Sequence, residues 1–264
     1  MPATPIVERV LLTNDDGIDA PGLAVLAEVA SQLAREVWIV APAEDQSGTS
    51  HSISLHEPLR VARRDARTYA VRGTPGDCVA LAVSHLMKDA APDLILSGVN
   101  RGTNLGTETV FSGTVGAAMT GLLLGIRSIA LSQTYSKGTP IRWETAREHA
   151  PAVIRTLVDA GWASDACLNV NFPDRAPAEV KPLVVTTQGA GLLSGIEVVS
   201  GTDPREIDYH WLTLSRAPQP EDPGSEATRI AAGHITVTPL QFERTHEAAG
   251  EALRKVLHKA LPGA

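Results

Sequence analysis

Several features of common protein classes are scarce in this sequence of 264 residues. Only two cysteines occur, Cys78 and Cys167, and their spacing fits neither a zinc site nor a disulfide framework. Aromatic residues make up 4% of the chain, whereas alanine, valine and leucine are plentiful, as expected where parallel strands pack between helices. The formal net charge of −7 argues against a protein that binds nucleic acids or membrane surfaces, since either partner attracts a basic face.

No segment has the form of a targeting or membrane-spanning sequence. The N-terminus lacks the basic and then apolar order of a signal peptide. The most apolar segment, Val115 to Leu131, is interrupted by Arg127 and is shorter than the roughly 20 residues that span a bilayer. We therefore expect a soluble, cytoplasmic protein with no nucleic-acid partner and no membrane partner.

Two common catalytic motifs are also missing. A P-loop, Gly-x-x-x-x-Gly-Lys-Ser/Thr, does not occur, and Ser112 does not lie in a Gly-x-Ser-x-Gly elbow. The segment Gly189 to Gly195 resembles a dinucleotide fingerprint, but its last glycine comes one residue late and it lies outside the predicted βαβ region. These absences argue against a P-loop nucleotide hydrolase and against a hydrolase built on a nucleophile elbow.

What the sequence does contain is an alternation of strands and helices. Short apolar runs predict strands, and apolar residues at helical spacing predict helices. The expected strands lie at 10–12, 37–40, 93–96 and 126–131, and the expected helices lie at 21–34, at 78–88, from Ser112 onward and at 143–160. This order, which continues to about residue 175, is typical of an α/β fold with a doubly wound, mostly parallel, Rossmann-like sheet.

The pattern changes after residue 175. Short strands are predicted at 183–187, 197–200, 209–214 and 234–239, joined by turns rich in glycine and proline, and a terminal helix is predicted at 247–260. We therefore expect one domain with two parts, a Rossmann-like core at 1–175 and a C-terminal elaboration of hairpins and a terminal helix at 176–264. The elaboration is predicted to take part in oligomer contacts.

The stretch from Ser97 to Gly121 combines loop and helix chemistry. It begins with glycine, asparagine and threonine, which indicate a loop, and continues from Ser112 as a helix of small residues. The first amides of a helix are unpaired and carry the positive end of its dipole, so they bind anions. This stretch is therefore a candidate phosphate cradle formed by Ser112, Gly113 and Thr114 with Asn104 nearby. A surface loop with a serine cap is the alternative.

Polar side chains follow three of the predicted strands. Asp15 and Asp16 come after the first strand. Ser47 lies in the loop after the second, and Asn100 comes shortly after the strand that ends at Leu96. Because ligands of parallel sheets bind beyond the carboxyl ends of the strands, these loops are expected to converge at one edge.

The chemistry of this set suits a metal ion. Two carboxylates, a hydroxyl and a carboxamide are hard oxygen ligands, which favour Mg²⁺, Mn²⁺ or Ca²⁺ over zinc or copper. A divalent ion would also relieve the repulsion between Asp15 and Asp16. The alternative for these two residues is a solvated acidic turn.

A cation beside a phosphate cradle predicts phosphoryl chemistry, in which the ion neutralises phosphoryl oxygens and lowers the pKa of a bound water. We predict a metal-dependent phosphomonoesterase with a catalytic set of Asp15, Asp16 and Asn100, in which Asp15 or Asp16 orients or deprotonates the water. Two alternatives use the same pocket. One is a non-catalytic nucleotide-binding or sensing protein, and the other is a transferase that uses the metal to hold a nucleotide diphosphate.

Taken in order, the motifs of the chain span nearly its whole length. They are Thr13–Gly17 with Ala20–Gly22, Ala41–Pro42 with Asp45–Gly48, Gly73–Pro75 with Asp77–Val79, Ser97–Gly106, Ser112–Ala118, Asn169–Pro173, Thr187–Gly189 and Val237–Leu240. This ordered set resembles the SurE family (survival protein E), whose members are metal-dependent 5′/3′-nucleotidases. One departure is Glu226, where we expect an aspartate, and we expect it to alter an oligomer or loop contact and not the chemistry.

The resemblance implies a cofactor, a substrate and an assembly. One divalent ion per subunit, Mg²⁺ or Mn²⁺, is expected on Asp15, Asp16, Ser47 and Asn100. Phosphate contacts are expected at Asn14, Asn104, Ser112, Gly113 and Thr114. The implied reaction is hydrolysis of nucleoside 5′- and 3′-monophosphates to nucleoside and phosphate, with trimming of short polyphosphate in some members. The implied assembly is a homodimer or homotetramer in which C-terminal hairpins or helices exchange between subunits.

Overall fold

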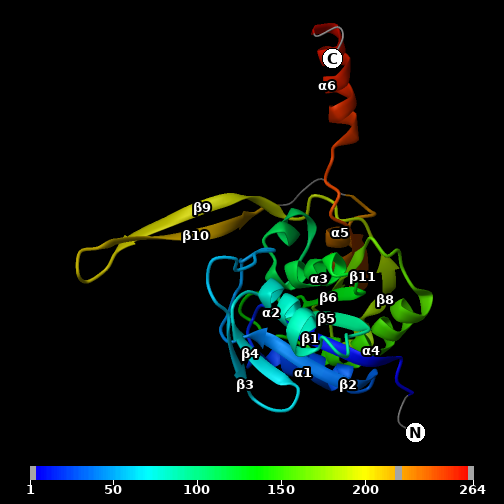
Figure 1. The fold of residues 1–264 in the computed structure, drawn as a ribbon. Coiled ribbons are helices and arrows are strands. Elements are labelled where there is room, and N and C mark those ends of the chain that lie inside the picture. Colours follow the sequence, from blue (N-terminus) through cyan, green and yellow to red (C-terminus); the bar gives the residue numbers. More distant parts are fainter. Residues whose placement is uncertain (1–3, 218–221, 261–264) are drawn as a thin grey trace.

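The computed structural model describes residues 4–217 and 222–260, and within them nine strands form one sheet (Figure 1). These strands are β1 Val7–Thr13, β2 Ala34–Pro42, β3 Arg60–Arg63, β4 Thr68–Arg72, β5 Leu94–Arg101, β6 Ser128–Gln133, β7 Cys167–Phe172, β8 Lys181–Val185 and β11 His234–Leu240. Their spatial order is β3-β4-β2-β1-β5-β6-β7-β11-β8. Neighbours pair in parallel except for β3 with β4 and β7 with β11, which confirms a mostly parallel sheet.

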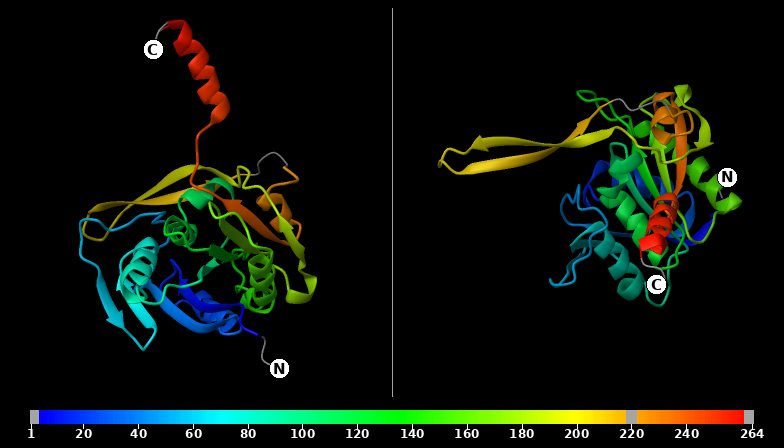
Figure 2. Two further views of the ribbon diagram at one scale, coloured as in Figure 1. Left: turned by 45° about the vertical axis from the view of Figure 1, so that its right-hand side comes forward. Right: turned by 90° about the horizontal axis from the view of Figure 1, so that it is seen from above.

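Helices cover both faces of this sheet. On one face lie α1 Pro21–Ala30 and α4 Trp143–Ala160, which contact each other. On the other face lie α2 Pro75–Leu81 and α3 Gly113–Leu123, which also pack together. Figure 2 shows these two layers from further directions. The arrangement is the doubly wound α/β fold that the alternation of strands and helices predicts.

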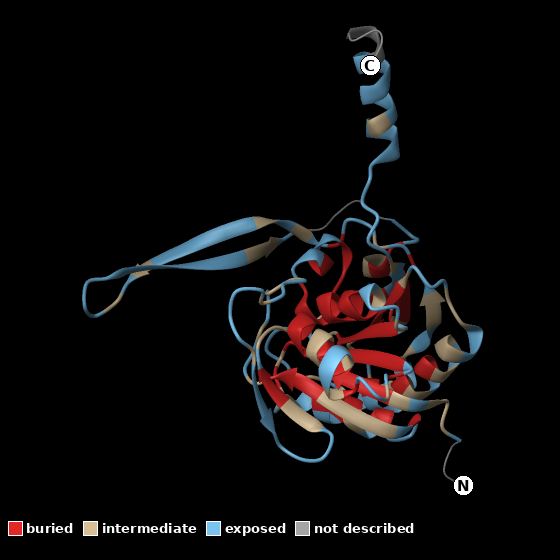
Figure 3. Cartoon of the chain, in the orientation of Figure 1, coloured by how far each residue is buried: buried red, intermediate tan, exposed pale blue. Residues whose placement is uncertain are grey.

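The alternation of side chains along the central strands explains why both faces carry helices. In β1, Val10 and Leu12 pack against α1 and α4, whereas Leu11 points to the face of α2 and α3. Residues 94–99 of β5 are likewise all buried. Figure 3 shows the burial concentrated in these central strands and in α3. A strand that is apolar on both faces requires a cover on each side, which the crossover helices provide.

Two C-terminal elements extend from this body (Figure 1). Strands β9 Leu193–Thr202 and β10 Asp208–Arg216 form a separate antiparallel hairpin, and α6 Glu247–Ala260 forms the terminal helix. The other C-terminal strands, β8 and β11, belong to the main sheet. The described part of the predicted elaboration thus contributes to the sheet as well as to the hairpin. Its residues 218–221 and 261–264 lie outside the described residues.

Most bounds differ by a few residues from those expected from the sequence, and three larger differences stand out. The helix expected at 21–34 ends at Ala30, because Ala34 pairs with Val7 of β1 as the start of β2. The helix expected at 78–88 begins at Pro75, because Thr74 and Asp77 form a capping box before it, and its last turns are a π-helix. The strand expected to end at residue 96 continues to residue 101. Among the described helices, none combines the length and the apolar character needed to cross a bilayer.

Candidate functional site

The sheet has its switch point between β1 and β5. From β1 the chain adds β2 and β4 on one side, and from β5 it adds β6 and β7 on the other. In open α/β sheets the crevice beyond the carboxyl ends of the strands at such a point is where ligands bind. Asp15 and Asp16 follow β1, and Asn100 lies at the end of β5. The predicted site residues therefore lie at the position that the topology favours.

Asp15 is buried between the end of β1 and the start of α3. The residue is 4% exposed, and its Oδ1 accepts a hydrogen bond from the hydroxyl of Thr114. Its backbone carbonyl accepts a hydrogen bond from the amide of Gln46 at 2.7 Å, which ties the first loop to the second. Burial raises the pKa of Asp15 to about 6, against the bond from Thr114, and the charge of Asp16 adds to the rise.

Asp16 joins the first loop to the third. Its Oδ2 accepts a hydrogen bond from the amide of Arg101 at 3.0 Å, at the end of β5. The residue is half-buried. Burial raises the pKa of Asp16, the bond and charge of Arg101 lower it, and the charge of Asp45 raises it. Both adjacent carboxyl groups therefore have a raised pKa, and burial is the main cause in each.

The other two predicted metal ligands offer uncharged oxygen atoms. Ser47 is exposed, and its amide donates to Oδ1 of Asp45 at 2.8 Å, which fixes the turn. Asn100 is half-buried, and its Nδ2 donates to the carbonyl of Gly102 at 3.0 Å, so its side-chain oxygen is the atom left for another partner. The register of β5 against β6 shifts between Ser97 and Asn100, and a bulge of this kind re-aims the side chains after it.

Helix α3 begins directly against Asp15. Ser112 is its N-cap, and the Ser112 hydroxyl accepts a hydrogen bond from the amide of Val115 at 3.0 Å. A glycine is required at position 113, because a Cβ there would lie 2.8 Å from the Cβ of Asp15. The first amides of α3 and the positive end of its dipole therefore adjoin a carboxylate at the switch point. This contact brings the predicted phosphate cradle and the predicted metal ligands together.

Besides Ser112 and Thr114, the other two predicted phosphate ligands with side chains also bond within the protein. The side-chain amide of Asn14 donates to the carbonyl of Gly17 at 2.8 Å, and its buried Oδ1 has no hydrogen-bond partner. The side-chain amide of Asn104 donates to the hydroxyl of Ser132 at 2.7 Å, and its backbone amide donates to Asn171 at 3.0 Å. A phosphate contact from either residue stays a prediction.

The donor set at the switch point fits a hard divalent cation. In the described residues, no three histidine, cysteine, aspartate or glutamate side chains are grouped to hold a metal, so a cation here would need the oxygens of Ser47 and Asn100 as well. Each aspartate uses one carboxylate oxygen in a hydrogen bond to the protein and keeps the other. All four ligands would supply oxygen, which is the preference of Mg²⁺ and Mn²⁺.

Two residues from the C-terminal third hold the segment 102–112, and neither of them was predicted from the sequence to be part of the site. Gln188 donates from Nε2 to the carbonyl of Gly106 at 2.8 Å, and Glu226 accepts from the amide of Gly106 at 2.6 Å. In the sequence, Glu226 stands out only as a departure from the family pattern. Whether glutamate in place of aspartate alters an oligomer or loop contact stays a prediction. A contact between residues 120 positions apart leaves no local sequence signal.

A cavity of about 720 Å³ adjoins the start of α3. Ser112, Val115 and Met119 line one side of it, and the segment 239–244 lines another. Its volume is in the range of small-molecule sites and suits a group of nucleoside size. The cavity therefore offers space for the organic part of a phosphorylated ligand.

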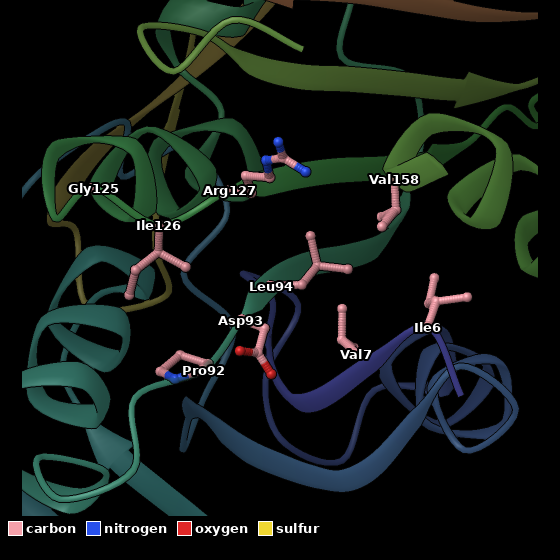
Figure 4. A pocket seen from close by; sticks show the side chains of 9 residues that line it. All are labelled: Ile6, Val7, Pro92, Asp93, Leu94, Gly125, Ile126, Arg127 and Val158. Carbon is pink, nitrogen blue, oxygen red and sulfur yellow. The ribbon is translucent and has the colours of Figure 1, made fainter. Parts of the chain in front are cut away.

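A second cavity, of about 430 Å³, lies at the opposite edge of the sheet, at the amino ends of β1 and β5 (Figure 4). Its carboxylate, Asp93, accepts hydrogen bonds from the amides of Glu8 and Arg9 at 3.0 and 2.8 Å. That carboxylate serves to join the two strand starts. Since none of the predicted site residues lines this cavity, we assign it no part in the chemistry.

Comparisons with known proteins point to one family. The family model described as Survival protein SurE matches residues 10–194. A protein of Burkholderia lata named 5′-nucleotidase SurE 1 is 67% identical over 253 residues, which cover 96% of this chain and 98% of that protein. A 5′-nucleotidase SurE of Parvibaculum lavamentivorans is 46% identical over 251 residues, which cover 94% and 91% of the two proteins.

A solved structure agrees with these relatives. The crystal structure of the SurE protein from Aquifex aeolicus matches with a TM-score of 0.80 at 33% identity. The match covers 94% of this chain and 99% of that one. The fold is therefore shared over nearly the full length of both proteins.

Proposed function

Because this chain belongs to the SurE family, we propose that it is a 5′-nucleotidase, a phosphomonoesterase that hydrolyses nucleoside 5′-monophosphates to nucleoside and inorganic phosphate. One observation carries this proposal. The helix start that suits a phosphate lies against Asp15, with Gly113 leaving no space for a side chain between them. A phosphate bound to the first amides of α3 would thus lie beside the carboxylates that suit a metal.

We assign the metal to Asp15, Asp16, Ser47 and Asn100, with Mg²⁺ or Mn²⁺ as the ion. When bound, the ion supplies positive charge for the phosphoryl oxygens and lowers the pKa of a coordinated water. Support for this assignment comes from the four oxygen donors and from the raised pKa of both aspartates. A cation would offset the charge that burial makes costly there.

The protein's own groups have two tasks in this proposal. The amides of Gly113 and Thr114 hold the phosphoryl oxygens, and the helix dipole stabilises their charge as the bond to the nucleoside breaks. Asp15 or Asp16 orients the attacking water or accepts its proton. The hydroxyl of Thr114 holds Asp15 in place through its bond to Oδ1. The nucleoside would occupy the cavity beside α3.

Two wider activities are part of the proposal because the family resemblance implies them. They are hydrolysis of nucleoside 3′-monophosphates and trimming of short polyphosphate. Both would use the same metal and the same helix start, since each transfers a phosphoryl group to water. The cytoplasm stays the compartment that we predict from the sequence.

We also propose that the chain forms a homodimer or homotetramer through its C-terminal elements. The hairpin β9–β10 carries Trp211 and Leu212, which are 68% and 74% exposed, and α6 carries Leu253 and Val256 at 62% and 63%. Both elements extend from the body in Figure 2. Apolar side chains gathered on protruding elements are typical of a surface that another subunit covers.

The first experiment measures release of inorganic phosphate from 5′- and 3′-nucleoside monophosphates with Mn²⁺, with Mg²⁺ or with EDTA. Release that needs the metal and stops with EDTA is the expected result. Asp16→Asn is expected to lower turnover by about 100-fold or more while the protein stays folded. Asp19→Asn is the matched control, because Asp19 is an exposed carboxylate of the same loop that pairs with Arg64.

Three other results would change the proposal. Binding of a nucleoside monophosphate without phosphate release in any metal would favour the nucleotide-binding protein. Release of a nucleoside monophosphate from an activated donor, in place of free phosphate, would identify the transferase. Turnover by Asp16→Asn equal to that of the unchanged protein would remove Asp16 from the metal site.

A further inference from the structure

The segment 102–112 links Asn100 to the cap of α3, and residues far along the chain fix its middle. The backbone amide of Gly106 donates to Oε1 of Glu226 at 2.6 Å, and its carbonyl accepts from Nε2 of Gln188 at 2.8 Å. The backbone N–H and C=O of Gly106 are therefore both bound to side chains from the last third of the sequence. Gly106 also lies against the backbone of Gly191, where a Cβ on Gly106 would meet an atom at 2.2 Å.

Glu226 reaches this segment from inside the protein. It is the first residue of α5 Glu226–Ala231 and is fully buried. Its second oxygen, Oε2, accepts hydrogen bonds from Nδ2 of Asn169 at 3.1 Å and from the hydroxyl of Thr238 at 2.7 Å. The carboxylate thus joins the segment 102–112 to β7 and β11 at one point.

Asn169 extends the same network to the predicted phosphate ligand. Its Nδ2 also donates to the backbone carbonyl of Asn104 at 2.8 Å, and Asn171 donates to that carbonyl at 3.2 Å. Glu226 therefore holds Gly106 directly and Asn104 through Asn169. The backbone from Asn104 to Gly106 is therefore held at both ends by buried side chains. It lies a few residues before Ser112, the N-cap of α3.

A buried carboxylate is costly unless its oxygens are hydrogen-bonded. Burial raises the pKa of Glu226 to about 7, against the bonds from Thr238, Gly106 and Asn169. These contacts come from uncharged groups, and the network satisfies either protonation state. The hydroxyl of Thr238 lies 2.8 Å from that of Thr186, so it can donate to a charged Glu226 or turn toward Thr186 and accept from a neutral one.

We infer that Glu226 is a positioning residue for phosphate binding, acting through Gly106 and Asn169 on the segment that leads into α3. It does not touch the substrate in this arrangement. Its carboxylate sets where the backbone of residues 104–106 lies, and with it the approach to the first amides of α3. This inference rests on the proposed function, which gives the segment a phosphate to bind.

The test compares Glu226→Gln with Glu226→Asp and with Thr186→Val. Glutamine keeps the size of the side chain, but its NH₂ group faces the NH₂ group of Asn169 in place of an acceptor. Aspartate keeps the carboxylate on a shorter side chain. Thr186→Val is the matched control, because it removes a buried hydroxyl from the outer end of the same network without touching Gly106.

Steady-state kinetics with a nucleoside 5′-monophosphate separate positioning from general stability. Glu226→Gln is expected to raise KM about tenfold with kcat within about twofold, because a displaced phosphate contact is lost equally in the ground state and the transition state. Glu226→Asp is expected to restore most of the affinity, and Thr186→Val to keep the original KM. A fall in kcat at unchanged KM in Glu226→Gln, in proportion to the folded fraction, would overturn the inference.

A binding measurement makes the test independent of turnover. Calorimetric titration of the Mn²⁺-loaded protein with inorganic phosphate is expected to show about tenfold weaker binding in Glu226→Gln than in the unchanged protein. If the unchanged protein binds phosphate but releases none from nucleotides, the proposed function fails while this comparison still decides the inference. Equal phosphate affinity in the two proteins would overturn it.

A spectroscopic measurement covers the case in which Glu226→Gln does not fold. In the unchanged protein the amide proton of Gly106 bonds to a carboxylate, and its chemical shift should follow the titration of Glu226. Addition of inorganic phosphate should then change both the chemical shift of this amide proton and the midpoint of its pH titration. A Gly106 amide that responds to neither pH nor phosphate would overturn the inference without any variant.

Discussion

The hydroxyl of Thr114 donates a hydrogen bond to Oδ1 of Asp15, and this contact joins two elements that lie 99 residues apart in the chain. It fixes the first turn of α3 against the loop that follows β1. It also leaves Oδ2 of Asp15 as the oxygen that can face a ligand. The helix start and the carboxylate therefore act as one unit, and either partner can be tested through the other.

Removing the hydroxyl in Thr114→Val is expected to weaken Mn²⁺ binding about fivefold to tenfold. Asp15 would lose the hydrogen bond that opposes the effect of burial, so its pKa would rise further and protons would compete better with the metal. Calorimetric titration with Mn²⁺ measures the change. Thr145→Val is the control, since Thr145 is also buried but bonds to the carbonyl of Arg175 beside α4. Unchanged Mn²⁺ affinity in Thr114→Val would contradict the role assigned to this bond.

Adding a methyl group in Gly113→Ala is expected to lower kcat/KM about 100-fold. The new Cβ would lie 2.8 Å from the Cβ of Asp15 and 3.0 Å from its Oδ2, so either the helix start or the carboxylate must move. Phosphate release from the best substrate is the measurement. Gly195→Ala in β9 is the control, because no atom lies within 4 Å of the added methyl group. Similar losses in both variants would show that the crowding at Asp15 is not the cause.

Glu226 is expected to make the protein less stable as the pH rises. Its pKa is raised from 4.5 to about 7 on folding, so the folded state binds a proton more tightly than the unfolded state. Protonated Glu226 therefore stabilises the folded state by on the order of 3 kcal/mol. This contribution to the free energy of unfolding is fully present below pH 4.5 and is lost as the pH rises toward about 7.

Urea unfolding of the metal-free protein at about pH 5 and about pH 8 measures this difference. Asp15 titrates in part of the same range, so the comparison with Glu226→Gln isolates the contribution of Glu226. The variant is expected to have a flatter dependence of the free energy of unfolding on pH. The same slope in both proteins would show that Glu226 does not titrate in this window.

Polar substitutions on the hairpin are expected to reduce the assembly. Trp211 and Leu212 are largely exposed on β10, and the double variant Trp211→Ser with Leu212→Ser would remove apolar area from any interface there. Light scattering after size-exclusion chromatography is expected to show a dimer or tetramer for the unchanged protein and a smaller species for the variant. Leu55→Ser, at a residue 75% exposed in the loop before β3, is the control. If the unchanged protein is a monomer, the proposed assembly is wrong.

Elements with a strong local pattern were predictable from the sequence. The helix at 143–160 has one apolar face and ends before Gly161, whose φ of 68° suits a glycine at a helix end. The terminal helix at 247–260 has the predicted bounds as well. The bounds of both helices follow from residues within or next to them, so the sequence alone was enough to predict them.

Elements that depend on distant partners were harder to predict. Gly98 and Asn100 have the composition of a loop, but pairing with β6 carries β5 through Asn100 to Arg101. Ala34 fits a helix locally, but its pairing with Val7 makes it the start of β2. In both places the hydrogen bonds of the sheet outweigh the local preference.

The candidate site divides in the same way. Asp15, Asp16 and Asn100 were predictable because each comes at the end of a strand, and a parallel sheet brings such ends to one edge. The bond from Gly106 to Glu226 was not predictable, because it depends on where β11 enters the sheet. That position is set by tertiary structure alone.

The place of β11 between β7 and β8 has a consequence for how the protein is made. The ribosome delivers β7 and β8 before β11, so β7 keeps an open edge and β8 has no partner in the sheet until residues 234–240 emerge. Because Glu226 bonds to Thr238 of β11, its contact with Gly106 is completed only in the same late step. A nascent chain therefore carries both aspartates long before it carries a finished phosphate site, and an early stop in translation leaves an open strand edge prone to aggregation.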